Sequence, residues 1–200
     1  MPGLAELGLI FIAYLVGSIP FGLVISRAVG RVDIRQHGSG NIGTANVLRT
    51  IGKRAAALTF VGDLLKGVLP VLAARLLGGT ELLVAAVGMA AVLGHNWSVY
   101  LRFTGGKGVA TSFGALVAMT PLPALFGFLV WLGVLLVFRY TSLSALMASV
   151  CIPPVIFFST GSGPYFFFSI LVAILIFVRH TDNIKRIRAG TEHRVGQRVP

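Results

Sequence analysis

Charged residues are scarce in this sequence, and carboxylates are the scarcest of all. Only 12% of the 200 residues are Asp, Glu, Lys or Arg, whereas about 25% is usual in soluble domains. The acidic residues of the polar segments, Asp33, Asp182 and Glu192, are not clustered. We therefore expect no Mg²⁺ site of paired carboxylates, and no metal or other cofactor. The single cysteine, Cys151, excludes an intramolecular disulfide.

Apolar runs, by contrast, are long. Hydrophobic residues make up 56% of the chain, and its mean hydropathy is +0.88. The runs at 4–24, 55–77, 82–101 and 164–178 approach the roughly 20 residues that a helix needs to cross a bilayer. The first run lacks the basic start and cleavage site of a signal peptide, so we expect it to remain as a span. These features predict an all-α integral membrane protein with one transmembrane domain over residues 1–200.

The basic residues indicate how the chain is oriented. There are 17 Lys and Arg and 6 Asp and Glu, which gives a net charge of +11. In a soluble protein this charge would suggest nucleic acid as a partner, but cytoplasmic loops of membrane proteins also collect Lys and Arg. The basic residues cluster at 27–54, 102–107, 139 and 179–198. We expect these clusters on the cytoplasmic side, and no nucleic-acid partner.

This orientation requires the apolar run at 109–138 to leave the cytoplasmic side and return, because Arg139 follows it. The prolines of TPLP at 120–123 break a helix, which predicts two helices at 108–119 and 123–138. A 12-residue helix spans only about 18 Å, so the first must tilt or end in a protein-lined recess. The alternative, one unbroken helix, would export the basic tail. We predict seven transmembrane helices, one or two of them short or tilted, with the N-terminus outside and the C-terminus cytoplasmic.

Three polar segments then meet at the cytoplasmic face. The first is GSGNIGTANVLR at 38–49. Its glycines allow positive φ and a close approach of the backbone to a ligand, and Ser39 and Asn41 are good N-cap residues for a helix that continues into the second span. Free amides at such a turn attract anions, and Arg49 can bind phosphate in a bidentate manner. The alternative is a flexible polar loop with a helix cap.

The second segment, RFTGGKGVATS at 102–112, surrounds Lys107 with glycines. It is not a Walker A loop, which has four residues between its first glycine and GK and a Ser or Thr after the lysine, so we expect no ATP. Lys107 alone could pair with lipid headgroups. Two basic glycine loops at one face instead favour an oxyanion or phosphate site.

The third segment, RHTDNIKR at 179–186, offers His180 as a base, as a residue that orients a hydroxyl, or as an interfacial side chain. Asn183 shares its helix face. Inside the second span, Asp63 and Lys66 lie three residues apart, and a lone charge at the bilayer centre costs about 3 kcal/mol or more. We expect these two to pair with each other or to reach the polar loops. His95 fits a buried, hydrogen-bonded histidine.

These segments, together with GSIPFG at 17–22, DLLKG at 63–67 and GH at 94–95, resemble the bacterial acyl-phosphate-dependent glycerol-3-phosphate acyltransferases, the PlsY type. The resemblance covers nearly the whole chain. This chain has Thr44-Ala45-Asn46 where the family usually has Ala-Thr-Asn, and Trp97-Ser98 where it tends to have Phe-Pro.

The resemblance implies transfer of a fatty acyl group from acyl phosphate to the 1-hydroxyl of glycerol 3-phosphate, which gives lysophosphatidic acid and phosphate, the first step of phospholipid synthesis. It implies a multi-pass protein of the bacterial inner membrane whose active site faces the cytoplasm. It also implies membrane lipids as surroundings and allows a transient contact with the enzyme that makes the acyl phosphate. The alternatives are a transporter or exchanger of a phosphorylated solute and a Mg²⁺-dependent polyprenyl phosphate transferase.

By the same resemblance, the matched motifs supply the site. The residues implied as catalytic are Ser39, Arg49, Lys107, His180 and Asn183. Those implied to bind substrate or phosphate are Gly38, Gly40, Asn41, Asn46, Thr104, Gly105, Gly106, Gly108 and Thr111. Asp63, Lys66 and His95 are expected to support them. Since both implied substrates carry a phosphate, we expect Lys107 and the amides of 105–108 to hold one phosphate and Ser39, Asn41 and Arg49 to hold the other. The sequence leaves open which loop binds which substrate, and whether His180 or a substrate phosphate oxygen accepts the hydroxyl proton.

Overall fold

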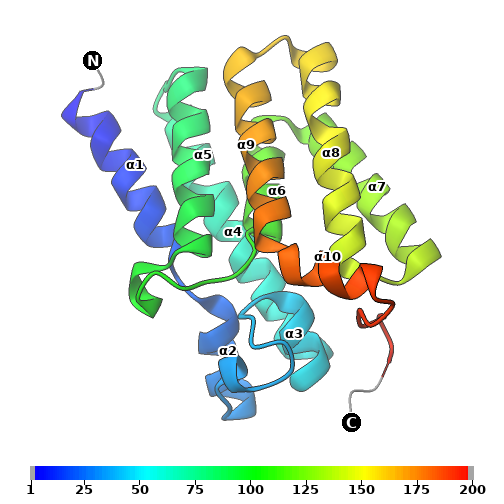
Figure 1. The fold of residues 1–200 in the computed structure, drawn as a ribbon. Coiled ribbons are helices and arrows are strands. Elements are labelled where there is room, and N and C mark those ends of the chain that lie inside the picture. Colours follow the sequence, from blue (N-terminus) through cyan, green and yellow to red (C-terminus); the bar gives the residue numbers. More distant parts are fainter. Residues whose placement is uncertain (1–2, 198–200) are drawn as a thin grey trace.

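Helices form the regular secondary structure of residues 3–197, the part of the chain that this computed structural model describes (Figure 1). The predicted all-α class is therefore confirmed for these residues. The α-helices are α1 (Leu4–Gly17), α2 (Phe21–Gly30), α3 (Thr44–Thr50), α4 (Lys53–Leu76), α5 (Glu81–Asn96), α6 (Val109–Met119), α7 (Pro121–Phe138), α8 (Thr141–Thr160), α9 (Gly163–Arg179) and α10 (Thr181–Arg188); short 3-10 turns occur at η1 (Ile34–Gln36) and η2 (Val99–Leu101).

Several of these helices are long and apolar enough to cross a membrane. Four described segments meet both conditions: Leu4–Gly30, which joins α1 and α2, and the helices α4, α7 and α8. A fifth results if α9 and α10, which meet at a 60° bend, are counted as one span. Helices α5 and α6 are apolar but shorter. The break between α6 and α7 was predicted from TPLP, and α7 begins at Pro121 because proline suits the first position of a helix.

Two of the predicted apolar runs are not continuous α-helices over their whole length. The run 4–24 is not one continuous helix, because α1 ends at Gly17 and α2 begins at Phe21, immediately after Pro20. Proline lacks the amide hydrogen and crowds the preceding turn, so the helix breaks there. The run 82–101 is helical only as far as Asn96, since Trp97 leaves helical geometry with φ −134° and ψ 70°.

The segment after the first glycine loop also differs from its prediction. Instead of one helix running into the second span, α3 and α4 are separated at Gly52, whose φ of 120° a residue with a side chain rarely adopts. Ser39 and Asn41 are not the N-caps of α3, since Gly43 occupies that position. The side chain of Asn41 instead accepts a hydrogen bond of 2.8 Å from the amide of Gly43, which forms a local turn before the helix.

Close helix packing in the bundle depends on glycine. A Cβ at Gly67 of α4 would overlap the backbone of Thr111 on α6, and one at Gly114 of α6 would overlap the backbone of Leu64 on α4. Gly94 makes a similar contact between α5 and α1. Helices in a membrane associate through such small residues, because lipid tails are as apolar as leucine and burial alone gives little driving force.

The polar segments lie at one end of this bundle. Figure 1 shows α2, α3, the green connection between α5 and α6, and α10 at the lower end, whereas the start of α1 and the α8–α9 turn lie at the upper end. A small apolar cluster of its own supports the first polar segment; it consists of Leu23, Ile34, Ile42, Val47, Ala55 and Ala56. The main core lies between α4, α5, α6, α8 and α9. Residues far apart in sequence are thereby fixed at a common end.

The glycine contacts predict a position-dependent effect on stability. Gly114→Ala should lower the free energy of unfolding by about 1–3 kcal/mol, because the added methyl overpacks against the α4 backbone. The measurement is the thermal unfolding midpoint in detergent. Gly133→Ala on α7, where the added methyl meets open space, is the matched control and should leave the midpoint unchanged or slightly raised. Equal midpoints for the two variants would contradict the packing argument.

Candidate active site

One buried carboxylate organises the polar end of the bundle. Glu192 accepts hydrogen bonds from Asn183 Nδ2 at 2.6 Å and Ser142 Oγ at 2.8 Å on Oε1, and from Arg186 Nε at 2.7 Å on Oε2. Burial would raise the pKa of Glu192, but these three hydrogen bonds outweigh it and hold the pKa below its usual value. Glu192 is therefore an ionised anchor that ties the tail to α8 and α10.

Lys107 joins this network through Asn183. Its ammonium donates a hydrogen bond to Asn183 Oδ1, so Lys107, Asn183 and Glu192 form one chain of contacts. The second and third polar segments, which are 76 residues apart at these positions, therefore meet side chain to side chain. The structure brings together this part of the predicted site.

Arg49 completes the convergence from the first segment. Burial lowers the pKa of Lys107 to about 8; the Glu192 charge opposes this, and the nearby charges of Arg186, Arg49 and Arg179 lower the pKa further. Burial also lowers the pKa of the half-buried Arg49, which feels the charges of Glu192 and Arg186. Arg49, Lys107 and Arg186 thus share the field of one carboxylate, and Arg179 adds a fourth positive charge near Lys107. Such an excess of positive charge in a poorly hydrated site favours binding of an anion.

The glycine loop before α6 is held from two sides. Arg179 donates hydrogen bonds to the carbonyl oxygens of Gly106 at 3.0 Å and Gly105 at 2.8 Å, and it lies over the ring of Trp97 at 5.6 Å. The amide of Gly106 donates to His95 O at 3.0 Å, so that amide does not face a ligand. Gly108, with a φ of 78°, immediately precedes α6. Among residues 3–197, no hydrogen-bond acceptor is recorded for the amides of Gly105, Lys107 and Gly108.

His180 lies at the junction of α9 and α10 and is almost fully buried. Its Nδ1 lies 2.8 Å from the carbonyl oxygen of Ile176. Since a carbonyl oxygen only accepts, Nδ1 carries the proton and the neutral ring presents a bare Nε2. Burial, followed by the charge of Lys107, lowers the pKa of His180 to about 4. The imidazole is therefore neutral at pH 7 and can accept a hydrogen bond.

Asn46 shapes the first loop from within. Its Nδ2 donates to the carbonyl oxygens of Ile34 at 3.2 Å, His37 at 3.0 Å and Asn41 at 2.9 Å, and its Oδ1 accepts from the Ser39 amide at 2.9 Å. The expectation that Asn46 contacts phosphate is not supported, because these bonds already occupy its buried amide. Gly38, Ser39 and Gly40 of this loop are exposed.

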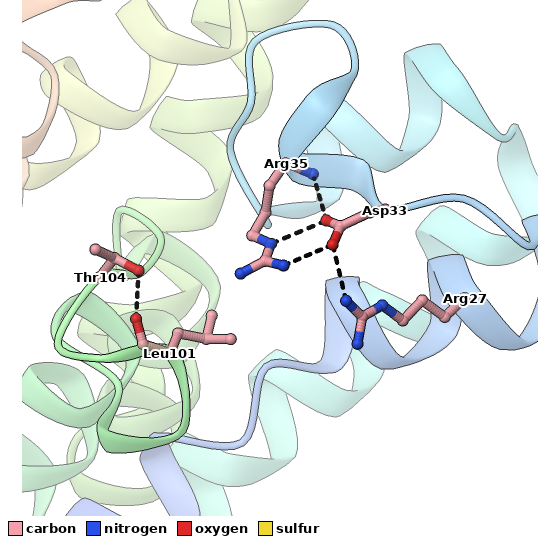
Figure 2. Close-up of polar contacts among 5 residues, drawn as sticks. All are labelled: Arg27, Asp33, Arg35, Leu101 and Thr104. Atoms are coloured by element: carbon pink, nitrogen blue, oxygen red, sulfur yellow. Dashed lines mark hydrogen bonds and ion pairs between the residues drawn. The ribbon is translucent and has the colours of Figure 1, made fainter.

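Two of the predicted binding residues, Thr104 and Thr111, lie outside the hydrogen-bond network of Lys107 and Glu192. The Thr104 hydroxyl donates to Leu101 O at 2.6 Å and closes a turn, as Figure 2 shows. Thr111 is fully buried on α6, where its backbone packs against Gly67 of α4. Neither hydroxyl joins the hydrogen bonds around Lys107 and Glu192. Both threonines are therefore placed as residues that shape the loop and the helix contact.

Asp33, the acidic residue of the first polar segment, is already paired. It lies between Arg35 and Arg27, at 2.6 and 2.8 Å (Figure 2). The hydrogen bond from Arg35 holds the pKa of Asp33 far below its usual value. Among residues 3–197, no group of three His, Cys, Asp or Glu side chains is arranged to hold a metal ion.

The supporting residues form a separate buried group. Lys66 Nζ lies 2.8 Å from Asp63 Oδ1, as the pairing of the two charges predicted, and His95 Nδ1 lies 3.6 Å from the same oxygen. Sequence reasoning missed Glu192, Arg179, Arg186 and Ser142 as members of the site. A lone Glu within a basic tail was the available signal for Glu192, since such a carboxylate needs a cation when it is buried.

The fold and the site together define a helical membrane protein with a cationic site at one end of its bundle. Comparison with known proteins then identifies the family. The family model described as "Glycerol-3-phosphate acyltransferase" matches residues 7–190. The chain is 47% identical over 193 residues to the glycerol-3-phosphate acyltransferase of Rubrobacter xylanophilus, with 96% of each chain covered. It is also 47% identical over 189 residues to that of Geotalea daltonii, with 94% of this chain and 97% of the relative covered. This chain belongs to the glycerol-3-phosphate acyltransferase family.

Solved structures agree with this assignment. The chain matches the glycerol 3-phosphate form of PlsY (YgiH), an integral membrane glycerol 3-phosphate acyltransferase, with a TM-score of 0.92 and 44% identity over 96% of both chains. The lysophosphatidic acid form matches with a TM-score of 0.90 and 43% identity over the same shares. The resemblance read from the sequence motifs is confirmed, and so are the integral membrane class and the acyltransferase function of the family.

The lowered pKa of Lys107 predicts an alkaline limit to activity. A lysine binds an anion only when protonated, so kcat/KM should fall as the pH rises through about 8, the pKa of Lys107 in the free protein. The measurement is kcat/KM between pH 6 and 10. Lys107→Arg is the matched control, because a guanidinium stays charged over this range, and its residual activity should show no such fall. An identical alkaline fall in both proteins would assign it to another group.

Proposed function

We propose that the chain transfers a fatty acyl group from acyl phosphate to the 1-hydroxyl of sn-glycerol 3-phosphate. The hydroxyl oxygen attacks the acyl carbon, the bond from that carbon to the phosphate oxygen breaks, and lysophosphatidic acid and inorganic phosphate leave. The observation that carries this proposal is the excess of Arg49, Lys107, Arg179 and Arg186 over Glu192 at one end of an apolar bundle. Both substrates are anions, and one also has a long apolar tail that requires a membrane setting.

We further propose seven transmembrane helices in one domain, residues 1–200, with the N-terminus outside and the site on the cytoplasmic side of a bacterial inner membrane. The common end of the polar segments in Figure 1 supports this topology. Arg139, at the α7–α8 turn, supports it as well, because basic residues favour the cytoplasmic side. Membrane lipids surround the bundle, and the enzyme that makes the acyl phosphate would approach from the cytoplasm.

We infer two phosphate-binding sites. Lys107 and the amides of Gly105, Lys107 and Gly108 form one, with Asn183 holding the lysine in place. Arg49 and the exposed loop around Ser39 form the other. Because these cations are close enough to influence one another's pKa, the two phosphates would lie side by side. Positioning the reactants in this way removes a large part of the activation barrier of an acyl transfer.

The sequence left two candidates for the proton acceptor, His180 and a substrate phosphate oxygen. The phosphate oxygen is the stronger base of the two. A phosphate monoester has a second pKa of about 6, whereas the pKa of His180 is about 4. The phosphate oxygen therefore accepts the hydrogen bond of the attacking 1-hydroxyl and takes its proton. The bare Nε2 of His180 accepts a hydrogen bond from the neighbouring 2-hydroxyl and so orients the substrate. Lys107 and the neighbouring arginines stabilise the negative charge that develops at the acyl carbonyl and at the leaving phosphate.

A detergent assay tests the proposal and separates it from solute transport. Purified protein given palmitoyl phosphate and glycerol 3-phosphate should release phosphate without any membrane barrier. Lys107→Ala and Arg49→Ala should each lower kcat/KM by about 10²–10³-fold, because each removes a positive charge that stabilises the transition state. Arg188→Ala, an exposed cation of α10, is the matched control and should stay near wild type. Absence of release by the wild-type protein would reject the function.

Variants of His180 test the proton acceptor. His180→Ala should lower kcat by about 10–100-fold through loss of orientation. The acidic limb of the pH profile should remain near pH 6 in this variant, because it belongs to the substrate phosphate. The measurement is kcat/KM against pH for the wild type and the variant, with and without added imidazole. Loss of the limb together with rescue by imidazole would make His180 the base instead.

A further inference from the structure

A second group of charged side chains lies inside the bundle, apart from the cations of the active site. Asp63, Lys66 and His95 are 2, 2 and 3% exposed. Lys66 Nζ pairs with Asp63 Oδ1 at 2.8 Å, and it also donates to Ile19 O at 2.8 Å, at the break between α1 and α2. A buried ion pair of this kind is weak evidence for stability, since apolar residues of similar volume often replace one without loss. Its position therefore needs another explanation.

His95 connects this pair to the glycine loop. Its Nδ1 faces Asp63 Oδ1 at 3.6 Å, and its carbonyl oxygen accepts the Gly106 amide at 3.0 Å. The other ring nitrogen, Nε2, lies so close to Gly106 that a Cβ there would overlap it. Gly105 packs equally tightly on the carbonyl oxygens of His95 and Asn96. The ring and the backbone of one residue thus support two successive glycines.

The two ring nitrogens of His95 have different neighbours. Nδ1 lies 3.6 Å from the carboxylate of Asp63, whereas Nε2 packs against Gly106. Because a carboxylate accepts a hydrogen bond only from a protonated nitrogen, we expect Asp63 to favour the Nδ1–H tautomer of His95, with a bare Nε2 against the loop. Lys66 pairs with Asp63 at 2.8 Å and balances its charge inside the bundle.

We propose that Asp63, Lys66 and His95 are positioning residues for the phosphate seat on the Gly105–Gly108 loop. They hold Gly105 and Gly106 on α5, while Arg179 holds the two glycine carbonyls from the other side at 2.8 and 3.0 Å. Clamped between these partners, the backbone directs Lys107 to Asn183. The inference rests on the proposed function, because it concerns the seat of one of its two substrates.

The first test removes the pair without leaving a charge unpaired. In Asp63→Leu combined with Lys66→Met, the thermal unfolding midpoint should stay near that of the wild type. The KM for the substrate whose phosphate occupies this loop should rise about tenfold or more, because the seat is misplaced, while the KM for the other substrate changes by less than about twofold. A folded variant with both KM values unchanged would overturn the proposal. Wild-type protein that releases no phosphate would instead reject the function.

The second test is a double-mutant cycle between ring and loop. Gly106→Ala should impair kcat/KM strongly in the wild type, because the methyl meets His95 Nε2. In the His95→Ala background the same substitution should cost about tenfold less, since the ring that it strikes is gone. Equal losses in the two backgrounds would mean that the ring does not support the loop.

A third measurement does not depend on whether any Asp63 or Lys66 variant folds. Wild-type protein labelled with ¹⁵N at histidine should give, for His95, a protonated Nδ1 and an unprotonated Nε2. The His95→Ala spectrum assigns the signals. The opposite tautomer, or a doubly protonated ring, at pH 7 would overturn the proposed role of Asp63.

Discussion

The imbalance between four cations and one buried carboxylate is the constraint on which this site depends. Glu192 accepts hydrogen bonds from Arg186, Asn183 and Ser142. Its negative charge also raises the pKa of Arg49 and of Lys107, against the effect of burial. It cannot neutralise all of them. Burial makes the remaining positive charge costly, as the lowered pKa of Lys107 reflects. A bound phosphate lowers that cost. The affinity for anionic substrates therefore comes from buried positive charge that the folded chain leaves unneutralised.

The bundle maintains this imbalance because helix packing fixes the backbone of the segments that carry the cations. Glycine contacts bring α4 onto α6 and α1 onto α5, so that the loop before α6 starts from a rigid base. The small apolar cluster under α2 and α3 does the same for the segment carrying Arg49. Asn46 then sets the shape of that segment from inside, in the way that His95 and Arg179 set the glycine loop. Pre-organisation of this kind spares the substrates the entropy of ordering the site.

Much of this could be predicted from the sequence, because charge and proline act locally. The TPLP motif predicted the α6–α7 break, and the distribution of Lys and Arg predicted that Arg49, Lys107 and Asn183 meet at one end. The remainder depended on partners distant in sequence. Glu192 looked isolated because its partner Ser142 is 50 residues away, and because Asn183 and Arg186 reach it only when the tail folds back against α10. Asn46 was read as a phosphate ligand because nothing in the sequence shows which way a loop amide turns.

Proton uptake on phosphate binding tests the central claim most directly. If a bound anion stabilises the charged form of Lys107, binding of inorganic phosphate at pH 8 should raise the pKa of that lysine. The protein should then take up a fraction of a proton from solution. Titration calorimetry in two buffers with different ionisation enthalpies measures this uptake. The account predicts uptake in the wild-type protein and none in Lys107→Ala. Phosphate binding of equal strength in both proteins, without any uptake of protons, would contradict it.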